Sequence, residues 1–189
     1  MPEGLTWGQR FTLWLGRRLA LRHQRVSLAR SCRIHAGARI HPRSGYIHIG
    51  EGTAVADGAV IQGNVSLGDH CSLQMYSILV GYGSSDQPDG RILIGNHVRI
   101  ASHVMMIGAN HIFADGTVPI HHQGLRHQPI VVEDDVWVGA GAIVVAGVTI
   151  GRGTVIGAGS VVTKTIPPMS VAVGTPACVI RSRANPTTE

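Results

Sequence analysis

The chain has 189 residues and a mass of 20.0 kDa, which suits one domain. Hydrophobic residues make up 44% of it, charged residues only 14%, and 25 residues are glycine. A disordered chain would carry more charge, and a helical bundle far fewer glycines. No apolar run approaches the roughly 20 residues that span a bilayer. Arg17 and Arg18 interrupt the apolar stretch near the N-terminus, so we expect no signal peptide. These properties predict a glycine-rich, β-rich domain in the cytoplasm.

The net charge of +5 comes from the first 30 residues, which contain six arginines and one acidic residue, Glu3. The remaining residues are balanced, so the basic character does not indicate a nucleic-acid-binding face, and we expect no nucleic-acid partner. The three cysteines, Cys32, Cys71 and Cys178, are an odd number without a CxxC spacing. They predict neither a disulfide framework nor a zinc motif, which agrees with a reducing compartment.

A helix is expected within residues 4–25, because Thr6 and Gln9 have the spacing of a capping box. Apolar side chains fall on one face of this helix, and three arginines fall elsewhere: Trp7, Phe11, Trp14, Leu15 and Leu19 against Arg10, Arg17 and Arg18. The first interpretation is that the aromatic face covers one end of the domain. The second is an interfacial helix that touches anionic lipid at the inner face of the membrane.

From Ile49 onward, aliphatic residues or Met recur every six residues. The positions are Ile49, Val55, Ile61, Leu67, Leu73 and Leu79; Ile94, Ile100 and Met106; and Val132, Val138, Val144, Ile150, Ile156 and Val162. A period of six fits neither a helix nor a hairpin strand. It fits a short strand followed by a turn, with three hexapeptides closing one triangular coil. The pattern predicts an all-β solenoid, a parallel β-helix, with Ile34 and Ile40 in a first coil of shifted register.

The chain therefore divides into a basic amphipathic helix and cap (residues 1–30), the β-helix (residues 31–182) and a C-terminal tail (residues 183–189). Two segments interrupt the repeat, near residues 81–91 and 111–129. A regular solenoid has no structural need for either one, and long loops on rigid scaffolds tend to carry function. The second loop contains His111, His121, His122 and His127.

Together with the repeat, an ordered set of motifs resembles the hexapeptide-repeat acyltransferases. They are Gly108-Ala-Asn-His111, Val118-Pro-Ile-His-His-Gln-Gly124, Val132-Glu-Asp-Asp-Val-Trp-Val-Gly139, Ile156-Gly-Ala-Gly-Ser-Val-Val-Thr-Lys164, Ile166-Pro-Pro168 and Gly174-Thr-Pro-Ala-Cys-Val-Ile-Arg181. The most similar branch is the sugar and polysaccharide O-acetyltransferases, which include maltose and galactoside acetyltransferase. The resemblance covers about residues 30–182. It implies a left-handed β-helix, a homotrimer and acetyl-CoA as co-substrate.

Transfer of an acyl group to a hydroxyl needs a base, and histidine is suited to that role near neutral pH. The resemblance implies that His111 is the general base. His121, His122 and His127 are left open between loop-stabilising roles and acceptor contact, and His103, on the repeat, is expected to be structural.

The resemblance also implies the residues of the donor site. Trp137 would line the channel for the pantetheine arm, and the backbone N–H of Ala140 would face the oxyanion. Ala158 and Thr163 would contact the arm. Lys164, the only lysine of the chain, and Arg181 would meet the phosphates. The chain departs from the family at Cys178, which replaces a usual lysine and removes one positive charge there.

Other functions are weighed against this one. A zinc-dependent γ-type carbonic anhydrase uses a similar solenoid, and His122 and His127 have a suggestive spacing, but both lie outside the repeat, and we expect no metal. A non-catalytic scaffold would leave the two loops unexplained. A non-sugar acceptor, such as an antibiotic or an amino-sugar amine, is the alternative within the same enzyme class. The expected acceptor is a free, nucleotide-linked or lipid-linked saccharide.

Overall fold

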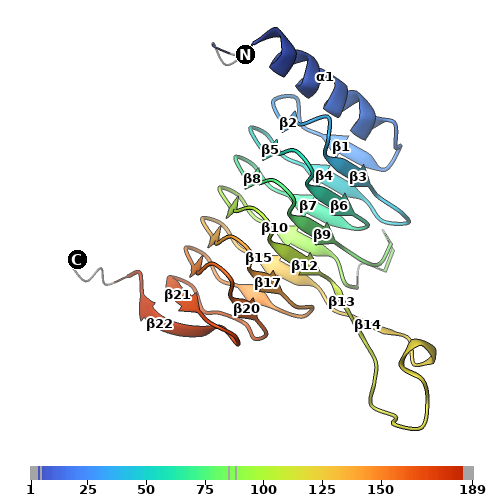
Figure 1. Cartoon of the computed structure of the whole chain (residues 1–189), viewed down its shortest axis with the longest axis vertical. Coiled ribbons are helices and arrows are strands. Elements are labelled where there is room, and N and C mark those ends of the chain that lie inside the picture. The colour runs from blue at the N-terminus through green and yellow to red at the C-terminus, as the bar shows by residue number, and fades with distance from the viewer. Residues whose placement is uncertain (1–3, 5, 85, 88, 185–189) are drawn as a thin grey trace.

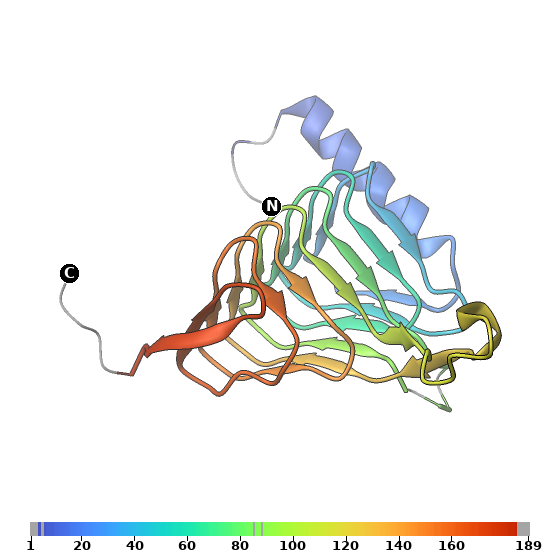
Figure 2. The same ribbon diagram turned by 60° about the horizontal axis from the view of Figure 1, so that its bottom comes forward.

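The computed structural model describes residues 4, 6–84, 86–87 and 89–184, which form a parallel β-helix behind one helix (Figure 1). Its strands belong to three sheets, named here A, B and C, that make up the sides of a triangular coil (Figure 2). Sheet A contains β1 (Val26–Leu28), β4 (Ile47–Ile49), β7 (Val65–Leu67), β10 (Ile92–Ile94), β15 (Ile130–Val132) and β18 (Thr149–Ile150). Sheet B contains β2 (Arg33–Ile34), β5 (Ala54–Val55), β8 (Ser72–Leu73), β11 (Arg99–Ile100), β16 (Trp137–Val138), β19 (Val155–Ile156), β21 (Ser170–Val173) and β22 (Cys178–Ser182). Sheet C contains β3 (Arg39–His41), β6 (Val60–Gln62), β9 (Ile78–Val80), β12 (Met105–Ile107), β17 (Ile143–Val144) and β20 (Val161–Val162).

The six-residue repeat is the core of the molecule. All fifteen repeat positions from Ile49 to Val162 are at most 4% exposed. Except at the two interruptions, residues four positions later are buried too. Their hydroxyls are satisfied: the Thr53 hydroxyl donates to the Gly68 carbonyl at 2.7 Å, and the Ser77 hydroxyl to the Ala101 carbonyl at 2.8 Å. The predicted all-β solenoid with an N-terminal helix is therefore confirmed.

Strands of consecutive coils pair in parallel, so that equivalent repeat residues lie side by side. In sheet C, for example, Ile61 lies beside Leu79, and Leu79 beside Met106. The first coil has the expected shifted register, because Ile34 pairs with Val55 and Ile40 with Ile61.

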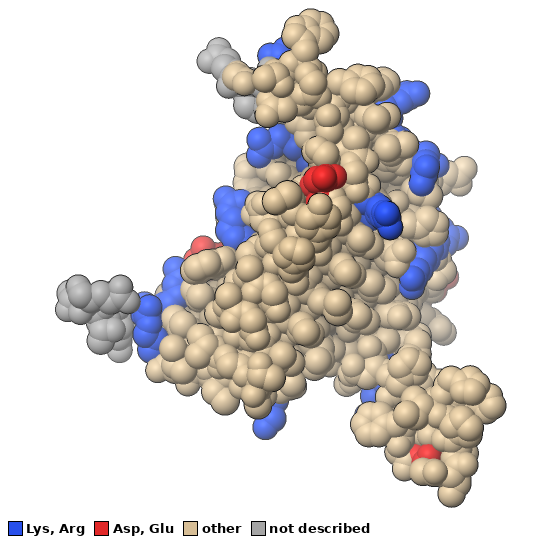
Figure 3. All heavy atoms as spheres, viewed as in Figure 1, with Lys and Arg blue, Asp and Glu red and all other residues tan. Residues whose placement is uncertain are grey.

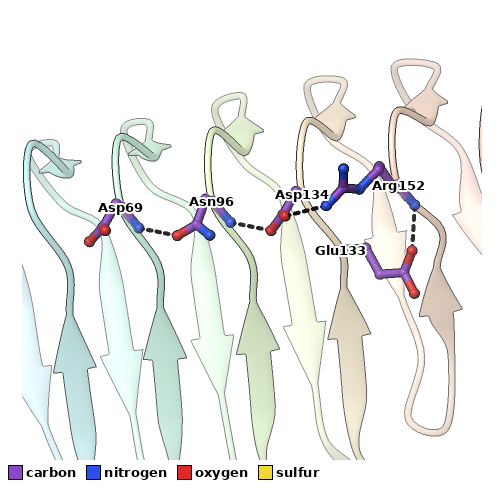
Figure 4. A network of polar contacts seen from close by, with 5 residues as sticks. All are labelled: Asp69, Asn96, Glu133, Asp134 and Arg152. Atoms are coloured by element: carbon purple, nitrogen blue, oxygen red, sulfur yellow. Dashed lines mark hydrogen bonds and ion pairs between the residues drawn. The ribbon is translucent and has the colours of Figure 1, made fainter.

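A polar ladder joins the coils along the corner between sheets A and B (Figure 4). The backbone N–H of Asp69 donates to the Asn96 side chain at 2.8 Å, and the N–H of Asn96 donates to the Asp134 carboxylate at 2.8 Å. Arg152 continues the ladder through an ion pair with Asp134 at 2.8 Å. The Asn96 and Asp134 side chains thus each accept from a backbone N–H of the coil before, and the Arg152 guanidinium donates to Asp134, which together fix the stacking.

Helix α1 spans Trp7–Leu21, shorter than the expected 4–25, and begins with the predicted capping box. The Gln9 N–H donates to the Thr6 hydroxyl at 3.3 Å, and the Thr6 N–H to the Gln9 side chain at 2.9 Å. The helix lies across the N-terminal end of the solenoid (Figure 1).

The expectation that the aromatic face of this helix covers the solenoid is wrong. Trp7, Phe11 and Trp14 are exposed, and the buried helix residues are Gly16 and Ala20. A Cβ at Gly16 would overlap the Ile34 carbonyl oxygen, so the helix packs through its smallest side chains because it approaches the backbone of the first coil closely.

Both interruptions leave the solenoid at the corner between sheets C and A, in consecutive coils. The longer one is not an irregular loop. It forms an antiparallel hairpin of β13 (Ala109–His111) and β14 (Leu125–His127), with a short 3₁₀ helix, η1 (Ile120–His122), near its tip. This segment, residues 109–127, projects from the solenoid (Figure 1) and is called the arm below.

At the C-terminal end, β22 folds back antiparallel onto β21. Of the expected tail, residues 185–189 lie outside the described residues.

Candidate active site

His111 is the last residue of β13, where the arm leaves the solenoid. The hairpin register places His111 opposite Leu125 and Asn110 opposite Arg126. The base of the arm forms a groove of about 450 Å³, lined by Asn110, His111, Ile112, Phe113, Ala114, Arg126 and Gln128. The histidine therefore stands beside two hydrogen-bonding side chains and one cation.

The His111 imidazole is open to a ligand. It is exposed, and within the described part of the chain no group forms a hydrogen bond with either ring nitrogen. Imidazole accepts and releases protons readily near neutral pH. The groove therefore offers a base to a hydroxyl or an amine bound in it.

His103 and the three other histidines of the arm each contact another ring. His127 stacks on Tyr82, with ring centroids 5.0 Å apart, and so joins the arm to the shorter loop. His121 and His122 lie side by side on η1, with centroids 3.8 Å apart. His103 stacks on Tyr76 at the corner between sheets B and C, 5.4 Å away, as its expected structural role requires.

Trp137, Ala140 and Ala158 lie on sheet B and on the corner between sheets B and C. Trp137 is 54% exposed on β16. The N–H groups of Gly139 and Gly141 donate to backbone carbonyls, whereas the N–H of Ala140 donates to none among the described residues. Ala158 repeats this arrangement one coil later. Among the described residues, Met75 and Ser102, at the same position in earlier coils, also donate to no acceptor. This turn therefore leaves a backbone N–H available in successive coils, and such a donor can stabilise an oxyanion where a ligand reaches it.

At this corner, Ala140 and Ala158 are each followed by a glycine, so no side chain covers the backbone there. Gly141 and Gly159 have φ of +69° and +67°, and a Cβ at either would meet nothing within 4 Å. In earlier coils this column holds Tyr76 and His103, whose rings cover it. The change from rings to glycines leaves a strip along which an extended chain of atoms can lie.

The other residues expected to bind the donor, Thr163 along the pantetheine chain and Lys164 and Arg181 at the phosphates, lie near the C-terminal end of the solenoid. Thr163 and Lys164 follow β20 at the corner between sheets C and A, and Arg181 lies on β22. All three are exposed, and neither cation forms an ion pair among residues 6–84, 86–87 and 89–184. Cys178 is exposed at the start of β22, and its Sγ contacts the Pro176 carbonyl at 3.6 Å.

One chain does not bring the predicted residues together. His111 lies at the corner between sheets C and A, whereas Ala140 and Ala158 lie at the other end of sheet C, at its corner with sheet B. Sheet C therefore separates the base from the unpaired donors within one chain. A site that uses both must draw on two chains.

Sequence reasoning missed Arg126 and Gln128, which line the groove with His111. Their place depends on the hairpin register, in which Arg126 faces Asn110. Apolar residues flanking a turn at Asp115-Gly116 were the available signal, but the pairing partner could not be read from them.

The described residues hold neither a set of side chains placed to bind a metal ion nor a helix able to cross a membrane. They contain no group of three His, Cys, Asp or Glu side chains placed to hold a metal ion. Among the same residues, no helix has the length and apolar character needed to cross a membrane.

Comparison with known proteins identifies the repeat. Residues 129–164 match the family described as bacterial transferase hexapeptide (six repeats). A probable acetyltransferase of Mycobacterium tuberculosis is 32% identical over 161 residues, which are 84% of this chain and 50% of that protein. Galactoside O-acetyltransferase of Escherichia coli is 41% identical over 98 residues, 49% of this chain and 45% of that protein. The chain thus spans about half the length of the curated relatives it matches.

A solved structure has the same fold over nearly the whole chain. AntD, an N-acyltransferase from Bacillus cereus crystallised with dTDP and 3-hydroxybutyryl-CoA, is similar with a TM-score of 0.75 and 22% identity. The match covers 88% of each chain. The left-handed β-helix expected from the motifs is thereby supported at the level of the fold. From the repeat, the stacked coils and these relatives, the chain belongs to the hexapeptide-repeat family of acyltransferases.

Proposed function

We propose that the protein transfers the acetyl group of acetyl-CoA to a hydroxyl of a sugar or polysaccharide precursor, with His111 as general base. The observation that carries this is the groove at the base of the arm, where His111 stands beside Asn110 and Arg126 and its ring nitrogens bond to no group among the described residues. Those neighbours can hold a polyhydroxylated acceptor through hydrogen bonds.

The reaction needs no acyl-enzyme. His111 takes the proton of the acceptor hydroxyl as its oxygen bonds to the thioester carbonyl carbon, and the C–S bond then breaks. The imidazolium returns the proton to the departing thiolate, so the histidine is restored. Kinetics then follow a ternary complex rather than a ping-pong scheme.

The donor lies along the corner between sheets B and C. The N–H of Ala140, which has no acceptor among the described residues, stabilises the oxyanion, and Trp137 and Ala158 line the pantetheine chain. Thr163 contacts that chain from a second protomer, because within one protomer it lies at the other end of sheet C, at its corner with sheet A. The bare strip at Gly141 and Gly159 supports this path. Lys164 and Arg181 bind the phosphates of acetyl-CoA.

The site is completed by a second chain in a homotrimer. Two observations support assembly: the separation of His111 from Ala140 by sheet C, and the exposed apolar side chains on the projecting arm, Phe113 at 73% and Ile120 at 55%. A mixing experiment tests it. His111→Ala and Trp137→Ala variants, each inactive alone, should regain part of the activity when unfolded and refolded together. Light scattering that shows a monomer at micromolar concentration would contradict the proposal.

The alternative acceptor is an amine nitrogen instead of a hydroxyl oxygen. Galactoside O-acetyltransferase and AntD, an N-acyltransferase, are both among the similar proteins. Mild alkali separates the two, because it hydrolyses an acetyl ester and leaves an acetamide intact. Product mass before and after this treatment, across free, nucleotide-linked and lipid-linked saccharides, identifies the bond formed.

The central experiment measures CoA release from acetyl-CoA with these acceptors. His111→Ala should lower kcat at least ~100-fold, because general-base catalysis contributes about 10²–10⁴-fold. It should still bind acetyl-CoA. His121→Ala and His122→Ala are matched controls on the same arm and should retain most of the rate. A His111→Ala variant that keeps more than about a tenth of the rate would place the base elsewhere.

The donor site has a separate test. Lys164→Ala should raise the KM for acetyl-CoA, with a smaller change in kcat. A well-formed charged contact contributes about 1.5–3 kcal/mol, and an exposed one less. If CoA and dephospho-CoA inhibit wild type and variant equally, Lys164 does not bind the 3′-phosphate.

A further inference from the structure

The outer face of α1 is aromatic and faces away from the protein. Trp7 is 91% exposed, Phe11 60% and Trp14 57%. Trp7 and Gly16 are nine residues apart, which is two and a half helical turns, so they lie on opposite sides of the helix. With Gly16 buried against the first coil, the aromatic side chains point outward.

The orientation of this helix is fixed. Its close approach at Gly16 leaves no room for a larger side chain on the inner face. Arg17 also anchors it, since its guanidinium donates to the Ala29 carbonyl at 2.8 Å and to the Leu28 carbonyl at 3.4 Å. Rotating the helix about its axis so as to bury the aromatic face would break these contacts. The exposed face is therefore part of the folded structure.

Positive charge surrounds the same face. The Arg18 guanidinium lies 5.8 Å from the centre of the Trp14 ring, so it belongs to the aromatic face rather than the opposite one. Arg10 and Arg22 are exposed on its flanks. Residues 4–50 contain nine arginines and no acidic residue, whereas residues 51–189 contain seven basic and ten acidic residues. Figure 3 shows basic side chains around this end of the molecule.

We propose that this face, made of Trp7, Phe11, Trp14 and Arg18 with Arg10 and Arg22 beside it, docks on a membrane surface rich in anionic lipid. Indole and phenyl rings favour the boundary between headgroups and acyl chains, and arginines are attracted to anionic headgroups. A second copy of the chain is a poor occupant, because a symmetric contact through this face would bring Arg10, Arg18 and Arg22 of one copy against the same three arginines of the other. This inference does not depend on the reaction proposed above.

The test is binding of the full chain to vesicles. We expect co-sedimentation with vesicles containing phosphatidylglycerol and little with pure phosphatidylcholine, with weakening at high salt. Two of the three tryptophans lie on this face, so tryptophan emission should shift to shorter wavelength on binding. The double variant Trp7→Ala/Trp14→Ala should lower the partition coefficient about tenfold or more and lose the shift.

A second variant tests the charges independently. Arg10→Gln/Arg18→Gln should weaken binding to phosphatidylglycerol vesicles by about fivefold per arginine and reduce its salt dependence. Ile180→Ala and Arg91→Gln are matched controls, because these exposed residues lie away from α1, and they should bind as wild type does.

Three results would overturn the proposal. The first is wild-type protein that stays in the supernatant with anionic vesicles. The second is unchanged binding by both double variants. The third is a change of oligomeric state in Trp7→Ala/Trp14→Ala, which would show that another copy covers the face.

Discussion

The coils of the solenoid and the arm use apolar residues in opposite ways. In the coils, Leu73 and the other repeat residues are buried against neighbours above and below. On the arm, Phe113 and Ile120 are exposed, and the backbone pairs only within one hairpin. The coils thus supply rigidity, whereas the arm presents side chains to something outside the chain. The proposed base, His111, stands where the repeat is interrupted.

The largest effect that separates the two regions is on stability. Leu73→Ala should lower the free energy of unfolding by about 2–5 kcal/mol, because it leaves a cavity in a fully buried coil. Phe113→Ala removes a larger side chain from the arm and should change it by less than about 0.5 kcal/mol. Urea unfolding of both variants measures the difference. Equal losses would show that the arm is part of the cooperative core.

The junction between the two regions should be sensitive to added volume. A Cβ at Gly108 would overlap the Gly90 carbonyl oxygen, where the shorter loop meets the base of the arm. Gly108→Ala should cost about 1–3 kcal/mol and lower kcat, since His111 lies three residues away. Gly116→Ala, near the tip of the arm with nothing within 4 Å, is the control and should affect neither quantity. Normal activity in Gly108→Ala would show that the packing at this junction does not position His111.

A smaller effect is expected where Tyr82 stacks on His127. Tyr82→Ala removes the stacking interaction with His127, which contributes about 0.5–1.5 kcal/mol to stability. It should therefore speed hydrogen exchange of the Ile112 amide, which donates to the Gly124 carbonyl across the arm. Tyr82→Phe keeps the stack and should behave as wild type. His97→Ala removes a comparable stack, on His70, from a solenoid corner and should leave exchange in the arm unchanged. The same exchange pattern in both alanine variants would deny Tyr82 a role in holding the arm.

The smallest expected effect is on the pH dependence of Tm, and it involves two carboxylates whose pKa is lowered, Glu51 and Asp115. Hydrogen bonds from Ser31 lower the pKa of Glu51 below its ordinary 4.5, and these bonds join the first two coils. The contribution of Glu51 to stability is present above the ordinary pKa and is lost as the pH falls through the lower folded value. The difference in Tm between wild type and Glu51→Gln should therefore shrink below about pH 4.5.

Asp115 provides the comparison on the arm. Hydrogen bonds from Thr117 lower its pKa as well, but Thr117 is only two residues away. That pair can form without the solenoid, so Asp115→Asn should leave the pH dependence of Tm unchanged. A shift as large as that of Glu51→Gln would show that the arm and the coils unfold together.

Much of the fold could be predicted from the sequence, because burial repeats with the chain. Within each of the three blocks of the repeat between Ile49 and Val162, every sixth residue faces the core, and Thr6 and Gln9 cap the helix as their spacing indicates. The helix face was predicted wrongly because hydrophobicity favours burying Trp7 and Phe11. Close backbone packing at Gly16 decided otherwise, and such packing leaves no hydrophobic signal.

The candidate site was only partly predictable. Motifs placed His111 at the exit of the repeat, but the groove beside it depends on the hairpin register that brings Arg126 opposite Asn110. Pairing between strands separated by a long turn is not encoded in a local pattern. The unpaired N–H of Ala140 likewise follows from the geometry of the corner.

The stack of coils also acts as a spacer of fixed length. In sheet C, β3, β6, β9 and β12 are successive neighbours, so the arm leaves three inter-strand steps after the coil on which α1 rests. At about 4.8 Å per step, His111 stands roughly 14 Å along the solenoid from that coil. Removing one whole coil would bring the arm closer to the helix by about 4.8 Å without turning it to another side. The number of repeats between helix and arm therefore sets the distance along the solenoid between α1 and His111.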